Sequence, residues 1–222
     1  MNIKFFFKKE KQLIGKELIN SLLSRYDKIY QEKIYKTNRD NIYEFSNNTI
    51  LKEPLFELAL NKVHEKFQLI VNQKDLKFNK LWLVLTEKNF EKKNVLPYIP
   101  HIDKQRYLKA MVYLHDVSLE HGPIHLGKVK EEVDIESTRK NLPKNYKEKG
   151  LNTIGQDLVE GELSPILGEA GDVIFFDTNT PHKAGEVKAG FSRKVLRFDF
   201  ERVGFNDKPN LFKNLINKIL KN

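Results

Sequence analysis

The sequence predicts a mainly β domain with flanking α-helices. Short runs rich in β-branched and aromatic residues follow one another through the second part of the chain, separated by turn residues. These runs do not alternate with helices, which favours an antiparallel sheet over a parallel α/β arrangement. Two segments with helical spacing of apolar residues precede them, and a third ends the chain.

A length of 222 residues suits one domain with a sizeable core. We expect a single domain, 1–222, with mainly helical support in 1–75 and a sheet core in 78–205. Its 40% apolar and 31% charged residues are ordinary for a soluble globular protein. The absence of cysteine excludes disulfides, thiolate metal sites and cysteine nucleophiles.

The N-terminal part has two predicted helices. Residues 8–34 form the first, and residues 54–70 the second, because Pro54 suits a first helical turn. A short hairpin is expected over 41–51, around Ser-Asn-Asn. The apolar positions at helical spacing in the first helix are Leu13, Ile14, Leu18, Leu22 and Leu23.

The strands are predicted in KLWLVLTE, YIPHIDKQRYLKAMVYLHDV, GPIHLGKV, GDVIFFDT and SRKVLRFDFERV. Between the third and fourth lies a polar span, 128–162, with seven basic and five acidic residues in 128–149 alone. A span of this length inside a domain is typical of a lid, a binding loop or a disordered insert. We interpret it as a lid-like insert.

The net charge of +9 lies at the two ends of the chain. Residues 1–16 and 208–222 each carry +4, which leaves about +1 between them. Only 7 of the 39 basic residues are Arg, so nucleic-acid binding is not favoured. The tail 208–222 reads as a basic amphipathic helix, which could contact an anionic membrane; we favour packing on the sheet.

No apolar run reaches the eighteen or so residues that a membrane helix needs. The apolar run near the start is too short for the core of a signal peptide, and no small-residue cleavage site follows it. We therefore expect a cytoplasmic protein.

The stretch YIPHIDKQRY places His101 and Asp103 two residues apart. In a strand they would share one face, about 6–7 Å apart along the backbone. Such a pair also arises by chance, and it could be a surface pair, so its partners elsewhere decide its meaning. GDVIFFD, a predicted buried strand, is followed by the turn TNTP, which delivers His182 at the mouth of that strand.

The next strand places Arg193, Val195, Arg197 and Asp199 on one face. An arginine that points into a barrel implies an anionic ligand or a buried acid. Two histidines and one carboxylate form the facial triad typical of non-haem Fe(II), with open positions that suit a bidentate 2-oxoacid and O2. A guanidinium is the natural partner for the distal carboxylate of such an acid. Arg193 is preferred for this role, and Arg197 competes.

The order His101-x-Asp103, distal His182 and then Arg193 resembles the Fe(II)/2-oxoglutarate-dependent oxygenases, in particular the phytanoyl-CoA dioxygenase-like family. YLHDVSLEHGPIHLGKVK and GEAGDVIFFDTNTPHKAG are similar to two segments of that family, and the resemblance covers about residues 80–200. It implies a double-stranded β-helix, a jelly-roll or cupin-like core. It also implies Fe(II), 2-oxoglutarate and O2, release of succinate and CO2, and hydroxylation of a C–H bond in a small molecule.

Three positions depart from the family pattern. Ala184 stands where a Ser or Thr often supplies a second contact to the oxoglutarate carboxylate. An aromatic residue of the strand after the His-x-Asp pair is replaced by Met111, with Tyr113 a possible substitute. The usual Pro-Gly-Ser-His turn has become residues 125–128. Because a carboxylate ligand is retained, the resemblance argues against a halogenase.

Other readings stay open at this point. His182 could cap a turn, and Arg193 could pair with an acid in the sheet. His115 and His125 could line the pocket, although strand histidines with satisfied hydrogen bonds are favoured. Three protein ligands with open positions would equally serve Zn²⁺ in a cupin-like hydrolase or isomerase. A third alternative is a module whose basic termini dock on an anionic surface.

Overall fold

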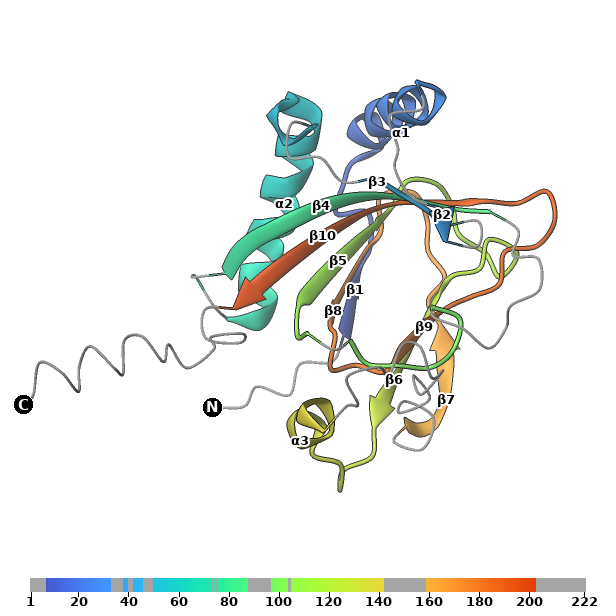
Figure 1. The fold of residues 1–222 in the computed structure, drawn as a ribbon. Coiled ribbons are helices and arrows are strands. Elements are labelled where there is room, and N and C mark those ends of the chain that lie inside the picture. The colour runs from blue at the N-terminus through green and yellow to red at the C-terminus, as the bar shows by residue number, and fades with distance from the viewer. Residues whose placement is uncertain are drawn as a thin grey trace, which may run out of the picture.

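A computed structural model describes residues 7–32, 38–39, 42–45, 50–72, 74, 76–87, 97–103, 105–141 and 159–202. Two antiparallel sheets face each other, and two helices cover the outer side of the larger sheet (Figure 1). This is the double-stranded β-helix that the sequence predicts, with its flanking helices. No helix among the described residues has both the length and the apolar composition to cross a membrane.

The larger sheet has seven strands among the described residues, and its centre is built from segments far apart in the sequence. The smaller sheet has the order β7-β6-β9, with β7 (Val159–Pro165), β6 (Ile124–Val129) and β9 (His182–Ala184). The order of the larger sheet is β1 (Phe7–Glu10), β8 (Val173–Asp177), β5 (Leu108–Tyr113), β10 (Arg193–Arg202), β4 (Leu76–Thr86), β3 (Ile42–Phe45) and β2 (Asn38–Arg39).

The helices pack their apolar faces on the outer face of the larger sheet. α1 (Lys16–Gln31) and α2 (Pro54–Val71) bury residues such as Leu22, Phe56 and Phe67 against Phe175 and other outward-facing residues of the sheet. α2 begins at Pro54, as predicted, and is followed by the cap residue Asn72 in a left-handed conformation (φ 49°) that asparagine tolerates well. A short 3₁₀ helix, Ile50–Lys52, precedes α2.

The strands alternate between two cores, as a side-chain period of two requires. On β10, Leu196, Phe198 and Phe200 face the helices, whereas Val195 faces the smaller sheet. The inner core between the sheets contains Val84, Met111, Tyr113, Val117, Ile124, Leu126, Ile174 and Phe176. The space between the sheets, which holds the candidate site, is therefore lined by one face of each central strand.

Several sequence predictions need correction. The predicted helix 8–34 is wrong at its start, because Phe7–Glu10 pairs with β8 as an edge strand and α1 begins only at Lys16. The N-terminal part is thus part of the sheet as well as helical support. β2 and β3 pair as a short antiparallel hairpin. The predicted turn at Ser46–Asn48 lies outside the described residues. The predicted tail helix, 208–222, also lies outside them.

Part of the predicted insert, 128–162, belongs to regular strands and a helix rather than to a loop. Its start completes β6, and its end belongs to β7, which pairs with β6. A short helix, α3 (Ile135–Lys140), lies between them and is preceded by Asp134, whose side chain accepts hydrogen bonds from the N–H groups of Glu136 and Ser137. Residues 142–158 lie outside the described residues.

Candidate metal centre

His101 and His182 are joined by their backbones. The N–H of His101 donates to the carbonyl of His182 at 3.0 Å, and the N–H of His182 donates back at 2.9 Å. His101 forms only this isolated bridge, and Asp103 belongs to no regular element. The expectation that both lie on one strand is therefore wrong. The bridge to β9, rather than strand alternation, brings the three side chains together.

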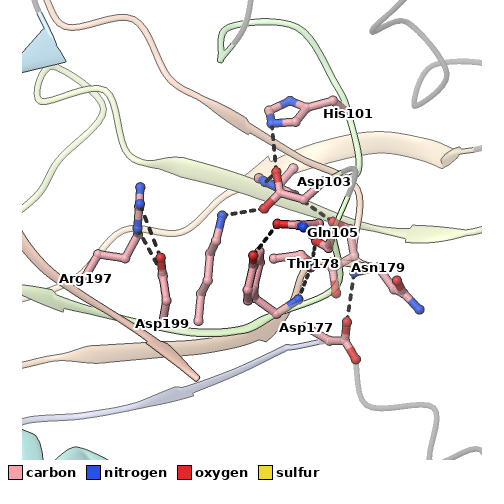
Figure 2. A network of polar contacts seen from close by, with 12 residues as sticks. His101, Asp103, Gln105, Asp177, Thr178, Asn179, Arg197 and Asp199 are labelled. Atoms are coloured by element: carbon pink, nitrogen blue, oxygen red, sulfur yellow. Dashed lines mark hydrogen bonds and ion pairs between the residues drawn. The ribbon is translucent and has the colours of Figure 1, made fainter. Parts of the chain in front are cut away.

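The loop that carries Asp103 is fixed to the turn before His182. The N–H of Asp103 donates to the Thr178 carbonyl at 3.3 Å, and Tyr107 and Thr178 exchange two hydrogen bonds at 2.8 and 2.9 Å. The guanidinium of Arg106 forms an ion pair with the buried carboxylate of Asp177, with Nη2 2.7 Å from Oδ2. Figure 2 shows Asp177, Thr178 and Asn179 gathered below the His101–Asp103 pair. Two segments distant in sequence are thus held in one geometry.

Both imidazole rings are held in a fixed tautomer. Nδ1 of His101 lies 2.7 Å from the carbonyl of Ile99, and Nδ1 of His182 lies 2.8 Å from the carbonyl of Thr180. A carbonyl can only accept, so each Nδ1 carries the proton and each Nε2 presents a lone pair. Such second contacts orient the rings of metal-binding histidines.

The two Nε2 atoms converge on one carboxylate oxygen. Asp103 Oδ1 lies 3.9 Å from His101 Nε2 and 3.6 Å from His182 Nε2. One candidate ligand atom from each residue lies within 4.8 Å of the other two. The rings lie 4.3 Å apart between centroids. Two neutral nitrogens and one carboxylate oxygen suit Fe²⁺, and they would equally accept other divalent first-row metals.

The second oxygen of Asp103 has a different partner. Lys109 Nζ lies 2.5 Å from Oδ2, so the ammonium holds the carboxylate from the side away from the histidines. Burial alone would raise the pKa of Asp103, but Lys109 and the two histidines outweigh it and hold that pKa well below its usual value. Lys109 was not foreseen from the sequence.

Burial and the neighbouring His182 lower the pKa of His101 to about 3. His101 is thus neutral in the folded, metal-free protein, whereas it takes up a proton near its ordinary pKa once unfolded. The unfolded state then binds more protons below pH ~6.5, so the free energy of unfolding falls as pH drops from there towards about 3.

We expect acidification to destabilise the metal-free wild type more steeply than a His101→Gln variant, by up to about 1.4 kcal/mol per pH unit. Urea unfolding at several pH values between 7 and 4.5 measures both slopes. Equal slopes would contradict the expectation.

Arg193 lies buried with almost no partner. Only 4% of its surface is exposed, and its Nη2 lies 3.5 Å from Thr86 Oγ1 at the end of β4. Its Nε and Nη1 have no hydrogen-bond partner among the described residues. A buried guanidinium without a carboxylate is strongly unfavourable unless a ligand supplies the anion.

Arg197 is already engaged. Its Nε lies 3.1 Å from Asp199 Oδ1, and its guanidinium lies 4.8 Å from the centroid of the Trp82 ring. The alternative that Arg193 pairs with an acid of the sheet is wrong for the described residues. These contacts favour Arg193 over Arg197 as the residue that would anchor an organic acid.

The other predicted cofactor residues lie on the inner face of β5. Tyr113 is fully buried, and its hydroxyl donates to the carbonyl of Ile166 at 2.7 Å. Met111 is also buried in the inner core. Ala184 packs beside that core and has no hydroxyl to offer, whereas Thr86 brings one to Arg193. Thr86 is the last residue of β4 and lies within the predicted strand KLWLVLTE, but only the pairing of β4 with β10 shows that it reaches Arg193.

The remaining histidines lie elsewhere. His115 lies in a bend just after β5, not in a strand, and its Nε2 accepts a hydrogen bond from the N–H of Lys194 at 3.0 Å. His125 lines a cavity of about 290 Å³ together with Tyr98 and Lys183, and none of the three candidate ligands lines this cavity.

Comparison with known proteins gives a family and a fold. Residues 11–195 match the family model described as phytanoyl-CoA dioxygenase. No curated protein sequence matches the chain. Among solved structures, the non-haem α-ketoglutarate-dependent epimerase SnoN from nogalamycin biosynthesis is 15% identical, with a TM-score of 0.64 over 93% of this chain and 86% of SnoN.

Two further structures have the same fold. HygX from Streptomyces hygroscopicus, solved with nickel and 2-oxoglutarate bound, is 17% identical, with a TM-score of 0.62 over 90% of this chain and 84% of HygX. A Pseudomonas putida prolyl-4-hydroxylase is 15% identical, with a TM-score of 0.58 over 90% of this chain and 94% of that enzyme. At these identities the likeness shows the fold.

Proposed function

The chain belongs to the phytanoyl-CoA dioxygenase family, whose cofactors are Fe(II) and 2-oxoglutarate, and we propose that it hydroxylates an unactivated C–H bond of a small organic substrate. Bound Fe(II) would couple the oxidative decarboxylation of 2-oxoglutarate by O2, which yields succinate and CO2, to oxidation of the substrate. Hydroxylation is part of the proposal, because the similar folds include both an epimerase and a hydroxylase.

His101, Asp103 and His182 would hold the metal. Their donor set fits, because two preset imidazole lone pairs and one carboxylate oxygen converge and leave coordination positions open. Lys109 holds the other Asp103 oxygen, which favours a single Asp103 oxygen as ligand. The bound nickel and 2-oxoglutarate of HygX support a site of this kind.

The observation that carries the proposal is the guanidinium of Arg193. It would bind the distal carboxylate of 2-oxoglutarate, with the Thr86 hydroxyl beside it. The apolar residues of the inner core, among them Met111 and Val195, would exclude water around that ligand. A zinc hydrolase would leave Arg193 without a role.

Anaerobic addition of Fe(II) and 2-oxoglutarate to the metal-free protein tests the proposal. We expect a weak visible charge-transfer band that requires both components, and O2-dependent release of succinate once a substrate is found. A folded protein that binds Fe(II) without ever giving the band would contradict it. Activity with Zn²⁺ in the absence of O2 would instead favour the hydrolase or isomerase.

A further inference from the structure

The register of the three central strands arranges the inner face of the larger sheet in rows. Asp199 of β10 lies opposite Lys80 of β4 and Lys109 of β5. Arg197 lies opposite Trp82 and Met111. These two neighbouring rows, here called the charged rows, are Lys80–Asp199–Lys109 and Trp82–Arg197–Met111. The next row, Val84–Val195–Tyr113, is apolar apart from the tyrosine hydroxyl.

The charged rows lie beside the candidate metal centre. Lys109 reaches Asp103 directly, at 2.5 Å. Figure 2 shows Arg197 and Asp199 on the sheet to one side of Asp103. Arg193, six residues before Asp199 on the same strand, belongs to the far end of this face, about 20 Å along the strand at its usual rise. The rows are therefore separate from the proposed 2-oxoglutarate anchor.

Trp82 is the centre of a compact group of charges. Its Nε1 donates to Asp199 Oδ2 at 2.8 Å, and Lys80 Nζ lies 3.9 Å from the centroid of its ring. Arg197 contacts the same ring and the other oxygen of Asp199. Both oxygens of Asp199 are thus occupied, and Lys80 has no carboxylate within ion-pair distance among the described residues.

The positive charges of this group are only partly paired. Three cations, Lys80, Lys109 and Arg197, lie beside the carboxylates of Asp199 and Asp103. The next inward-facing residue of β10, Glu201, accepts a hydrogen bond from Asn79, and Lys80 forms no ion pair among the described residues. The Asp103 carboxylate is also a proposed metal ligand, so a divalent cation would share it and leave Lys109 less fully compensated. Cations that face the interior between two sheets are unfavourable unless an anion offsets them.

The group remains open to solvent to a limited degree. The side chains of Lys109, Arg197 and Asp199 are 13, 18 and 11% exposed. An incoming anion can therefore reach them, and it would do so where water screens charge less than at the surface. This combination is typical of a site that recognises a charged group of a ligand.

We propose that the charged rows bind an anionic group of the substrate, a carboxylate, sulfonate or phosphate, beside the metal. The inference rests on the proposed function and narrows its substrate to a small organic anion. Lys80 and Lys109 would contact the oxyanion, and Arg197, held by Asp199 and Trp82, would complete the cationic wall. The metal would then face a C–H bond near that charged group.

The chain has a single tryptophan, Trp82, so its fluorescence reports directly on this site. The protein is first loaded with Zn²⁺ and 2-oxoglutarate, which fills the proposed metal centre and the Arg193 site. Acetate, methanesulfonate and inorganic phosphate are then titrated at constant ionic strength, which keeps screening constant. We expect a saturable change of fluorescence with at least one anion, and the tightest of the three identifies the type of charged group.

The variants Lys80→Gln and Lys109→Gln should each weaken that anion at least about tenfold, as one lost charge-assisted contact does. Lys194→Gln is the matched control, because Lys194 lies on β10 but pairs with Asp27 of α1 on the outer face. Thermal unfolding of each variant confirms that it is folded.

Three outcomes would overturn the inference. They are the absence of a saturable fluorescence response, wild-type anion affinity in both lysine variants, and a fluorescence response that Arg193→Gln abolishes. Failure of the proposed function is a different result. It would be the absence of the Fe(II)–2-oxoglutarate band, whether or not anions change the fluorescence.

Discussion

Replacing Asp103 by alanine should abolish Fe(II) binding and turnover together. The substitution removes the only anionic ligand of the proposed set and leaves Lys109 beside the site without its carboxylate. An unpaired ammonium there would repel a divalent cation. Loss of a residue that only hydrogen-bonds to a metal ligand already lowers metal affinity by about 10- to 100-fold, so loss of this ligand should exceed that range.

Two measurements check this expectation: Fe(II) affinity under anaerobic conditions, and the charge-transfer band with 2-oxoglutarate. His182→Gln should behave in the same way, whereas His121→Gln is a matched control because His121 contacts Phe191 and Ser118 away from the candidate ligands. Wild-type metal affinity in folded Asp103→Ala would remove Asp103 from the ligand set.

The sequence predicted the members of the site better than the geometry that joins them. His101, Asp103 and His182 were selected by chemical type and order, and these three converge in the structure. The assumed strand over residues 98–107 does not form, because the backbone of His101 pairs only with His182 and Asp103 follows in a loop. A pairing between residues 81 positions apart leaves no local signal in the sequence.

The site residues that the sequence did not predict, Thr86 and Lys109, also depend on pairing between distant segments. Thr86 and Lys109 look like an ordinary strand end and an ordinary strand lysine. Their significance comes from the register of β4 and β5 with β10, which sets Thr86 opposite Arg193 and Lys109 opposite Asp199. The edge strand Phe7–Glu10 was missed because FKKE lacks the apolar alternation of a strand; among the described residues it pairs only with β8.

The alternation on β10 was, in contrast, a reliable guide. Leu196, Phe198 and Phe200 pack against the helices, and the face with Arg193, Arg197 and Asp199 lines the space between the sheets. The same alternation separates the two arginines. Arg197 and Asp199 are adjacent on that face, whereas Arg193 lies six residues from Asp199 and outside its reach.

Arg193→Met should produce two opposite effects. The affinity for 2-oxoglutarate should fall by about 2–5 kcal/mol, or from about 30-fold to several thousandfold, as when one partner of a buried charge pair is removed. The stability of the ligand-free protein should instead rise, by about 1–4 kcal/mol, because an apolar side chain of similar length replaces a buried and almost unpartnered cation. Titration of 2-oxoglutarate into the Zn²⁺-loaded protein and urea unfolding without ligands measure the two effects.

Arg197→Met supplies the control, because it changes the same residue type on the same face. It breaks the pair with Asp199 and leaves a largely buried carboxylate without its cation, so it should lower stability and leave 2-oxoglutarate affinity near that of the wild type. Loss of 2-oxoglutarate binding in Arg197→Met, with normal binding in Arg193→Met, would exchange the two roles. A gain of stability together with a loss of 2-oxoglutarate binding in Arg193→Met would mean that this guanidinium serves its ligand and lowers the stability of the ligand-free protein.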